Sequence, residues 1–118
     1  MRLTIHHRTT YSYARPVAFG LQQLRLTPKS RMGQSVLTWR MRVEGGTREL
    51  EYDDHHMNHV MLVSFSGDGH TLTVVSEGEV ETADTAGVVG KHAGFAPLWY
   101  FTNATRRTRI GQGVRAIA

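Results

Sequence analysis

Apolar and polar residues alternate with a period of two along most of the first two-thirds of the chain. Residues 3–13 give the clearest case, with Leu3, Ile5 and Tyr11 on one face and mostly polar residues on the other. A strand with one buried face requires this alternation, because successive side chains point to opposite faces of a sheet. Runs of the same kind predict further strands at residues 19–27, 37–44, 48–52 and 71–82, and the nearly continuous apolar run at residues 60–65 predicts another strand.

The spacing of these runs predicts an all-β fold. No stretch before residue 100 has the i, i+3, i+4, i+7 spacing of an amphipathic helix. Six or seven short strands at regular intervals are typical of an antiparallel β-sandwich or barrel, and we expect a sandwich over residues 1–96. The pair Gly45-Gly46 predicts a tight hairpin between two neighbouring strands, and the SGDG sequence at residues 66–69 predicts another turn.

The pattern changes after Thr82. Residues 83–94 are small and rich in glycine, which predicts a loop or an irregular crossing. Large apolar side chains then gather around residues 98–101. Such a cluster either closes one end of the sandwich or forms a surface that another domain covers. Beyond them Ile110, Val114 and Ile117 have helical spacing, but two glycines interrupt the segment and the pattern stops in mid-repeat. We therefore expect a linker followed by the truncated start of a helix.

Composition fits one ordinary globular domain and excludes several chemistries. The chain has 118 residues, of which 40% are hydrophobic and 20% charged. It has no cysteine, so disulfides, thiolate metal ligands and a cysteine nucleophile are excluded within it. The N-terminus lacks the apolar stretch of a signal peptide or a membrane span, so we expect a cytoplasmic protein that does not contact membranes. The net charge of +4 could steer an acidic partner but falls short of a dense nucleic-acid patch.

Several short motifs resemble one known family. Residues 7–34 contain an H-x-T-x-Y-x-Y strand, a proline, an L-R-L-x-P strand and a G-Q pair, in that order. Asp53, Asp54 and Asn58, followed by Val60, are similar to a D-x-x-G-N turn, with Met57 at the position of the glycine. These motifs resemble the N-terminal region of bacterial transglutaminase-like proteins, a family related to cysteine proteases. Residues 97–118 are similar in kind to the linker that leads into that family's catalytic domain.

The resemblance implies a non-catalytic accessory domain. In the family, a papain-like core with a Cys, His and Asp triad follows the linker and performs acyl transfer or peptide hydrolysis. This chain offers no cysteine to match the nucleophile, so we assign no catalytic residue and no cofactor site to it. The expected partners are the papain-like core in cis, a protein or peptide substrate, and a second copy in a homodimer. The residues predicted to form the interface are Trp99, Tyr100, Phe101, Ile110, Val114 and Ile117.

Two other function classes stay open. One is an independent β-sandwich module for protein binding or assembly, which would work without any enzyme. The other, favoured least, is a basic nucleic-acid-binding β domain that uses Arg106, Arg107 and Arg109 beside the aromatic residues. Aromatic residues that are contiguous rather than interleaved with the basic ones more often pack between domains, so we expect no nucleic acid partner.

Histidines supply the remaining candidate chemistry. His55 and His59 have the four-residue spacing of zinc ligands, but that spacing brings two side chains together only on a helix. In a turn between strands the side chains would diverge, so we expect no metal site there. His7 shares a strand face with apolar residues, which predicts a partly buried, hydrogen-bonded side chain rather than a general base.

Overall fold

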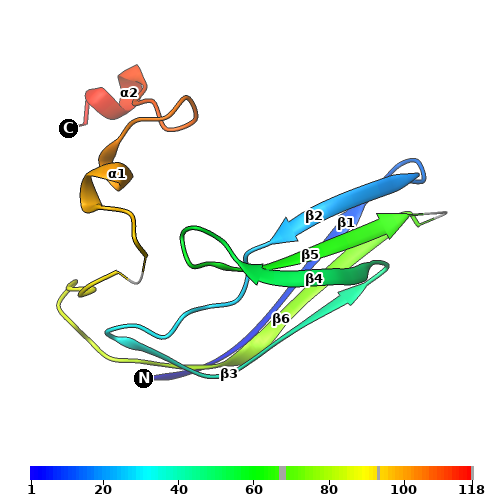
Figure 1. The fold of residues 1–118 in the computed structure, drawn as a ribbon, viewed down its shortest axis with the longest axis horizontal. Helices are drawn as coiled ribbons and strands as arrows, with labels where there is room; N and C mark the ends of the chain where they lie inside the picture. The colour runs from blue at the N-terminus through cyan, green and yellow to red at the C-terminus, as the bar shows by residue number, and fades with distance from the viewer. Residues whose placement is uncertain (67–68, 93, 118) are drawn as a thin grey trace.

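The computed structural model describes residues 1–66, 69–92 and 94–117, and these contain two antiparallel three-stranded sheets (Figure 1). One sheet has the strand order β1-β6-β3 and the other has the order β2-β5-β4. The all-β antiparallel fold predicted from the alternation is confirmed. The strands are β1 (Arg2–Ser12), β2 (Phe19–Leu24), β3 (Gln34–Glu44), β4 (Thr47–Asp53), β5 (His59–Ser66) and β6 (Thr71–Thr82).

The core lies between the facing sides of the two sheets. Leu72 and Val74 of β6 pack against Met61 and Val63 of β5 and against Leu24 at the end of β2. All five side chains are buried, and partly buried residues such as Met41 and Phe65 surround them. The central strands β5 and β6 therefore supply most of the buried apolar surface that stabilises the fold.

The connection at Gly45-Gly46 is a corner between sheets, so the predicted hairpin pairing is wrong. β3 pairs with β6, and β4 pairs with β5, although β3 and β4 are consecutive in sequence. Gly45 has a φ of +80°, and a Cβ there would collide with the carbonyl oxygen of Thr71. Glycine thus permits a close crossing from one sheet to the other. Residues 67 and 68 of the predicted SGDG turn lie outside the described residues.

Two details of the predicted strand faces also need correction. A bulge lies between Val36 and Thr38 of β3, so Val36 pairs with Val80 while Leu37 is exposed instead of sharing the face of Trp39. His7 is exposed rather than partly buried, with its Nε2 3.4 Å from Thr9 Oγ1. β1 is an edge strand of 11 residues, whereas β2 has six, so the shorter sheet leaves part of the longer one uncovered.

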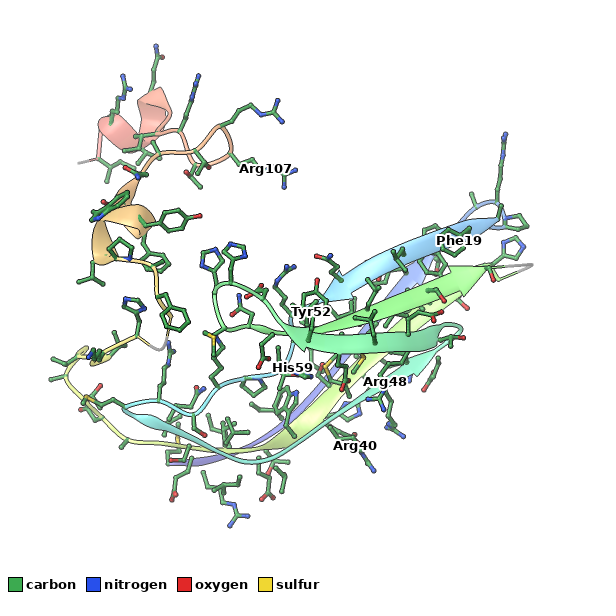
Figure 2. The ribbon with its side chains drawn as sticks, in the orientation of Figure 1. Phe19, Arg40, Arg48, Tyr52, His59 and Arg107 are labelled. Carbon is green, nitrogen blue, oxygen red and sulfur yellow. The ribbon has the colours of Figure 1, made fainter. Side chains whose placement is uncertain are left out.

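Ion pairs cover the outer face of the longer sheet. Glu77 on the central strand β6 forms ion pairs with Arg40 and Arg42 of β3. The Nε2 atom of His6 on β1 lies 3.7 Å from Glu77 Oε2. The Arg40 guanidinium, which donates to Glu77, and the nearby Arg42 hold the pKa of that carboxyl below its usual value against the opposing effect of burial. Figure 2 shows Arg40 pointing away from the sandwich interior. This face is thus solvated and its charges are largely paired.

Residues 83–92 and 94–117 form a tail whose two helices stand away from the sheets (Figure 1). It contains two short helices, α1 (Leu98–Thr102) and α2 (Gln112–Arg115), neither of which has a buried residue. The Cα radius of gyration is 18.0 Å, whereas a compact domain of this length would have about 13 Å. The helix predicted around Ile110, Val114 and Ile117 is a single turn that contains Val114, with Ile110 before it and Ile117 after it. Within the described residues, neither helix has the length and apolar character needed to cross a membrane.

Candidate interdomain interface

The segment between β4 and β5 is a tight turn built around Asp54. Its Oδ1 accepts hydrogen bonds from the backbone N–H groups of His56 and Asn58, both at 2.9 Å. The backbone closes the same turn, because Asp54 N–H donates to the Asn58 carbonyl at 2.9 Å and Met57 N–H donates to the Asp54 carbonyl at 2.8 Å. An aspartate that bonds the backbone two and four residues ahead fixes a compact turn.

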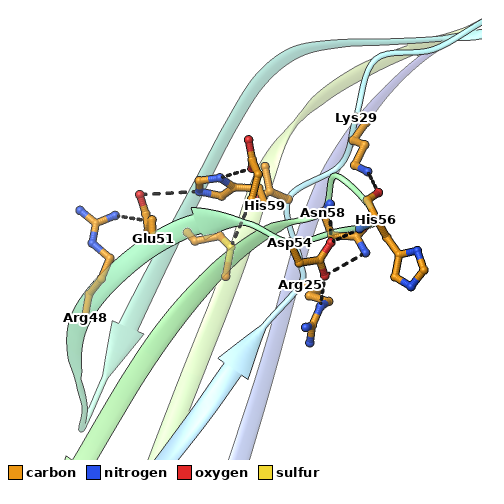
Figure 3. A network of polar contacts seen from close by, with 11 residues as sticks. Arg25, Lys29, Arg48, Glu51, Asp54, His56, Asn58 and His59 are labelled. Atoms are coloured by element: carbon orange, nitrogen blue, oxygen red, sulfur yellow. Dashed lines mark hydrogen bonds and ion pairs between the residues drawn. The ribbon is translucent and has the colours of Figure 1, made fainter. Parts of the chain in front are cut away.

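Two basic side chains from the segment after β2 hold this turn in place (Figure 3). Arg25 Nε donates to Asp54 Oδ2 at 2.8 Å, and Lys29 Nζ donates to the His56 carbonyl at 3.0 Å. Arg25 belongs to the L-R-L-x-P motif and Asp54 to the turn motif, so the ion pair joins two motifs that lie 29 residues apart. The two motifs therefore build one structural unit, which we call the Asp54 turn: residues 53–58 with Arg25 and Lys29.

The ionisation of Asp54 is stabilised by its surroundings. The Arg25 guanidinium, which donates to Asp54, holds the pKa of that carboxyl well below its usual value, and the N–H groups of Asn58 and His56 act in the same direction against burial. Asp54 is accordingly charged throughout the neutral range and serves as a fixed anchor. Oδ1 accepts two backbone hydrogen bonds, and Oδ2 accepts from Arg25 Nε and Asn58 Nδ2, so both oxygens are engaged within the turn. This fits a positioning role rather than acid–base catalysis.

Met57 adopts the conformation that its place in the motif predicts for a glycine. Its φ is +58°, in the left-handed region where a Cβ is disfavoured. The turn keeps its shape because the Asp54 hydrogen bonds and the ion pair with Arg25 enforce it. Methionine is thus accommodated at a cost in backbone energy.

The tail meets the sandwich at this turn. The ring of His56 lies 5.7 Å from the ring of Tyr100 and 6.2 Å from that of Phe101, centroid to centroid. Phe101 also contacts His92 edge to face at 5.5 Å. Two of the predicted interface residues therefore come together with His56, a contact that sequence reasoning missed because alternation says nothing about loop-to-loop packing.

The remaining predicted interface residues are exposed and do not pack on the sheets. Trp99 retains 64% of its surface exposed and Ile117 retains 90%. Ile110 and Val114 are each more than half exposed, as are Phe95 and Leu98 beside the cluster. Exposed apolar side chains gathered along one segment are typical of a surface that another protein covers. The assignment of these residues to an interface stays a prediction.

A groove opens between the tail and the sandwich. Its volume is about 1040 Å³, and it is lined by residues within 27–34 on the sandwich side, by His56 and Asn58 of the Asp54 turn, and by described residues of the tail between Val89 and Ile110. Lys29, Arg31 and Lys91 line it together with apolar side chains such as Met32. These three cations were not singled out from the sequence. The excess of basic residues after Thr82 could have drawn attention to Lys91, but Lys29 and Arg31 lie in the part of the chain whose charges balance.

His55 and His59 are not brought together as a pair. His55 lies in the turn with its ring 4.0 Å from that of His56, whereas His59 begins β5 and faces Asp53 at 3.3 Å and Glu51 at 3.6 Å. No group of three His, Cys, Asp or Glu side chains suited to a metal ion occurs among the described residues. The absence of bound metal in the protein itself stays a prediction for elemental analysis.

The two facing sheets and the Asp54 turn define an all-β sandwich domain with an apolar, cationic extension. The chain belongs to the family described as the bacterial transglutaminase-like N-terminal region, whose model matches residues 3–81. The match ends at the close of β6, so the tail lies outside it. The resemblance of residues 97–118 to the family's linker therefore stays a prediction.

One curated relative matches part of the chain. The chain is 32% identical over 81 residues to the uncharacterized protein ML0607 of Mycobacterium leprae (strain TN). The aligned part is 69% of this chain but 29% of the relative, so the chain spans less than a third of that protein. No solved structure matches the chain.

Proposed function

We propose that this chain is a non-catalytic accessory domain that packs beside a papain-like core of the same protein, and that the core performs the acyl transfer or peptide hydrolysis. The family to which the chain belongs supports an accessory role. The absence of cysteine supports it further, because thioester chemistry needs a thiolate nucleophile that these residues cannot supply. The domain contributes surface and positioning, and we expect it to work in the cytoplasm.

The exposed apolar tail is the single observation that carries this proposal. Trp99, Phe101 and Val114 are each more than half exposed on segments with no buried residue. Helices of five and four residues are unstable alone in water and gain their stability from tertiary contacts. A core docked on this face would supply those contacts, and the Asp54 turn would fix the direction in which the tail leaves the sandwich.

The coding sequence beyond residue 118 tests the proposal. We expect it to encode a domain with a cysteine followed by a histidine and an aspartate. When that domain and the sandwich are expressed as one protein, we expect the two to unfold in one cooperative transition. A stop codon directly after residue 118 would contradict the proposal. The chain alone should show no turnover on peptide or glutamine substrates.

The second candidate is an independent assembly module, and the same exposed tail favours it. An apolar patch that meets its own copy would form an isologous dimer through Trp99 and Phe101. Sedimentation of the chain alone, compared with a Trp99→Ser, Phe101→Ser double variant, measures this association. A concentration-dependent dimer that the double variant abolishes, with no core in the reading frame, would establish the module instead of the accessory domain.

A further inference from the structure

The net charge of the chain is concentrated in the tail. Residues 1–82 contain nine basic and nine acidic side chains, which cancel. Residues 83–118 contain five basic side chains and one acidic one, which accounts for the whole net charge of +4. In the sandwich the charges pair across strands, as in Arg8 with Glu44 at 3.0 Å. Among the described residues, the ion pairs all lie within residues 2–79, and none involves a cation of the tail.

The groove between the tail and the sandwich is lined by cations without a compensating acid. Lys29 and Arg31 come from the sandwich side and Lys91 comes from the tail, and no Asp or Glu is among the described residues that line it. Arg31 and Lys91 are exposed. Lys29 donates one hydrogen bond to the His56 carbonyl, and an ammonium group has two further donors. A hollow walled by charges of one sign raises the local concentration of the opposite charge.

The same groove has an apolar component. Met32 and Val89 line it from its two sides, and Ile110 and Phe101 line it further along the tail. Lining of this kind favours a ligand that carries both carboxylates and apolar side chains. An extended acidic protein segment meets both requirements, because its successive side chains alternate between opposite sides.

We propose that this groove binds an acidic, extended segment of the core that follows the tail in the same protein. The identity of the core as the source rests on the proposed function, whereas the acidic character of the occupant rests on the charge of the groove. The core is favoured over a separate protein because the tail forms one wall of the groove and would hold its neighbouring domain at high effective concentration.

Single-stranded nucleic acid is the less suitable polyanion here. Base stacking needs open aromatic faces. The rings of Tyr100 and Phe101 meet edge to face at 5.7 Å and both contact His56, which leaves Trp99 as the most exposed of the three. Arg107, which could contact phosphates, lies on the tail well away from the sheets (Figure 2). The aromatic and basic groups therefore do not form one continuous stacking platform.

Fluorescence anisotropy with a labelled peptide that alternates Glu and Leu tests the proposal on the chain alone. We expect saturable binding that weakens as salt is raised from about 0.05 M to about 0.5 M, because exposed charges are screened over that range. The matched peptide with Gln in place of Glu should not bind. Lys91→Glu should weaken binding about fivefold. Arg15→Glu makes the same charge change in the connection between β1 and β2, at the opposite end of the sandwich from the tail (Figure 1), and should leave binding unchanged.

The same peptide added to the longer protein distinguishes the source of the occupant. We expect no binding there, because the core's own segment fills the groove. Equal binding by the longer protein would overturn the core as the source. Failure of the chain to bind the Glu peptide, equal loss in Arg15→Glu, or tighter binding of oligothymidine would overturn the acidic-segment proposal. Any of these results would leave the accessory-domain proposal intact if the longer protein still unfolds in one transition.

Discussion

The sandwich and the tail differ in almost every property that stabilises a folded chain. In the sandwich, strand β6 has five consecutive buried residues from Leu72 to Ser76, and its acids Glu77 and Glu79 are paired with arginines. In the tail, α1 and α2 bury no residue, and all the excess positive charge of the chain lies there. The contrast teaches that the sandwich is stabilised by its own core, whereas the described part of the tail leaves its apolar side chains exposed, as the proposed docking of a core requires.

Substitution of one leucine in each region gives the largest expected difference. Leu72→Ala should lower the free energy of unfolding by about 2–5 kcal/mol, because Leu72 is fully buried in the core. Leu98→Ala in α1 should change it by no more than about 0.5 kcal/mol, because Leu98 is 73% exposed. Urea unfolding followed by circular dichroism measures both. A large loss in Leu98→Ala would mean that the tail belongs to the cooperative unit.

Acid sensitivity should belong to the sandwich and should come in good part from Asp54. Its pKa is lowered in the folded state, so the stabilisation is present above the unfolded value of about 4 and is lost as the pH falls toward the folded value. Asp54→Asn should be less stable at neutral pH and should lose less of its stability between about pH 6 and about pH 3. Thermal unfolding across that range measures the slope.

Asp53→Asn is the matched control for this effect. Asp53 is adjacent in sequence but exposed, and it faces His59 rather than Arg25. Its variant should retain the acid dependence of the parent chain. If Asp54→Asn and Asp53→Asn gave the same pH profile, the Asp54 turn would not be the anchor that the hydrogen bonds indicate.

Relief of backbone strain gives the smallest expected effect and again separates the two regions. Met57 in the Asp54 turn and Ala86 in the tail both have positive φ angles, of 58° and 48°. Met57→Gly should stabilise the sandwich by about 0.5–1 kcal/mol, because glycine removes the left-handed penalty but adds entropy to the unfolded chain. Ala86→Gly should produce no measurable change in the same transition. If Ala86→Gly stabilised the protein and Met57→Gly did not, the tail rather than the Asp54 turn would belong to the cooperative unit.

Strand positions could be predicted from the sequence because a half-buried strand leaves a period-two pattern, as in residues 3–13. Strand pairing could not be predicted in the same way. Gly45-Gly46 has the composition of a hairpin turn, but the choice between a hairpin and a corner depends on which distant strand pairs with β3, and that strand is β6. His7 was assigned to the buried side because alternation does not reveal how far the opposing sheet extends.

The candidate interface was predictable only in part. The cluster around Trp99 and the motif glycine position at Met57 could be recognised from residue type and order. The ion pair of Arg25 with Asp54 and the contact of His56 with Tyr100 join residues 29 or more positions apart, and local sequence patterns carry no information on such contacts. Charge offered a further signal. Basic and acidic side chains balance in residues 1–82 and basic ones are in excess after them, so the change in net charge falls at the end of β6.

Acrylamide quenching of Trp99 fluorescence tests the central claim most directly. With Trp39→Phe as the background, Trp99 is the single tryptophan of the chain, and in the longer protein that contains the core its signal is isolated as the difference between this background and the same background with Trp99→Phe. The account predicts ready quenching in the dilute chain, where Trp99 is 64% exposed, and strong protection in the longer protein. Equal quenching in both would contradict the claim that the tail is the surface on which the core docks.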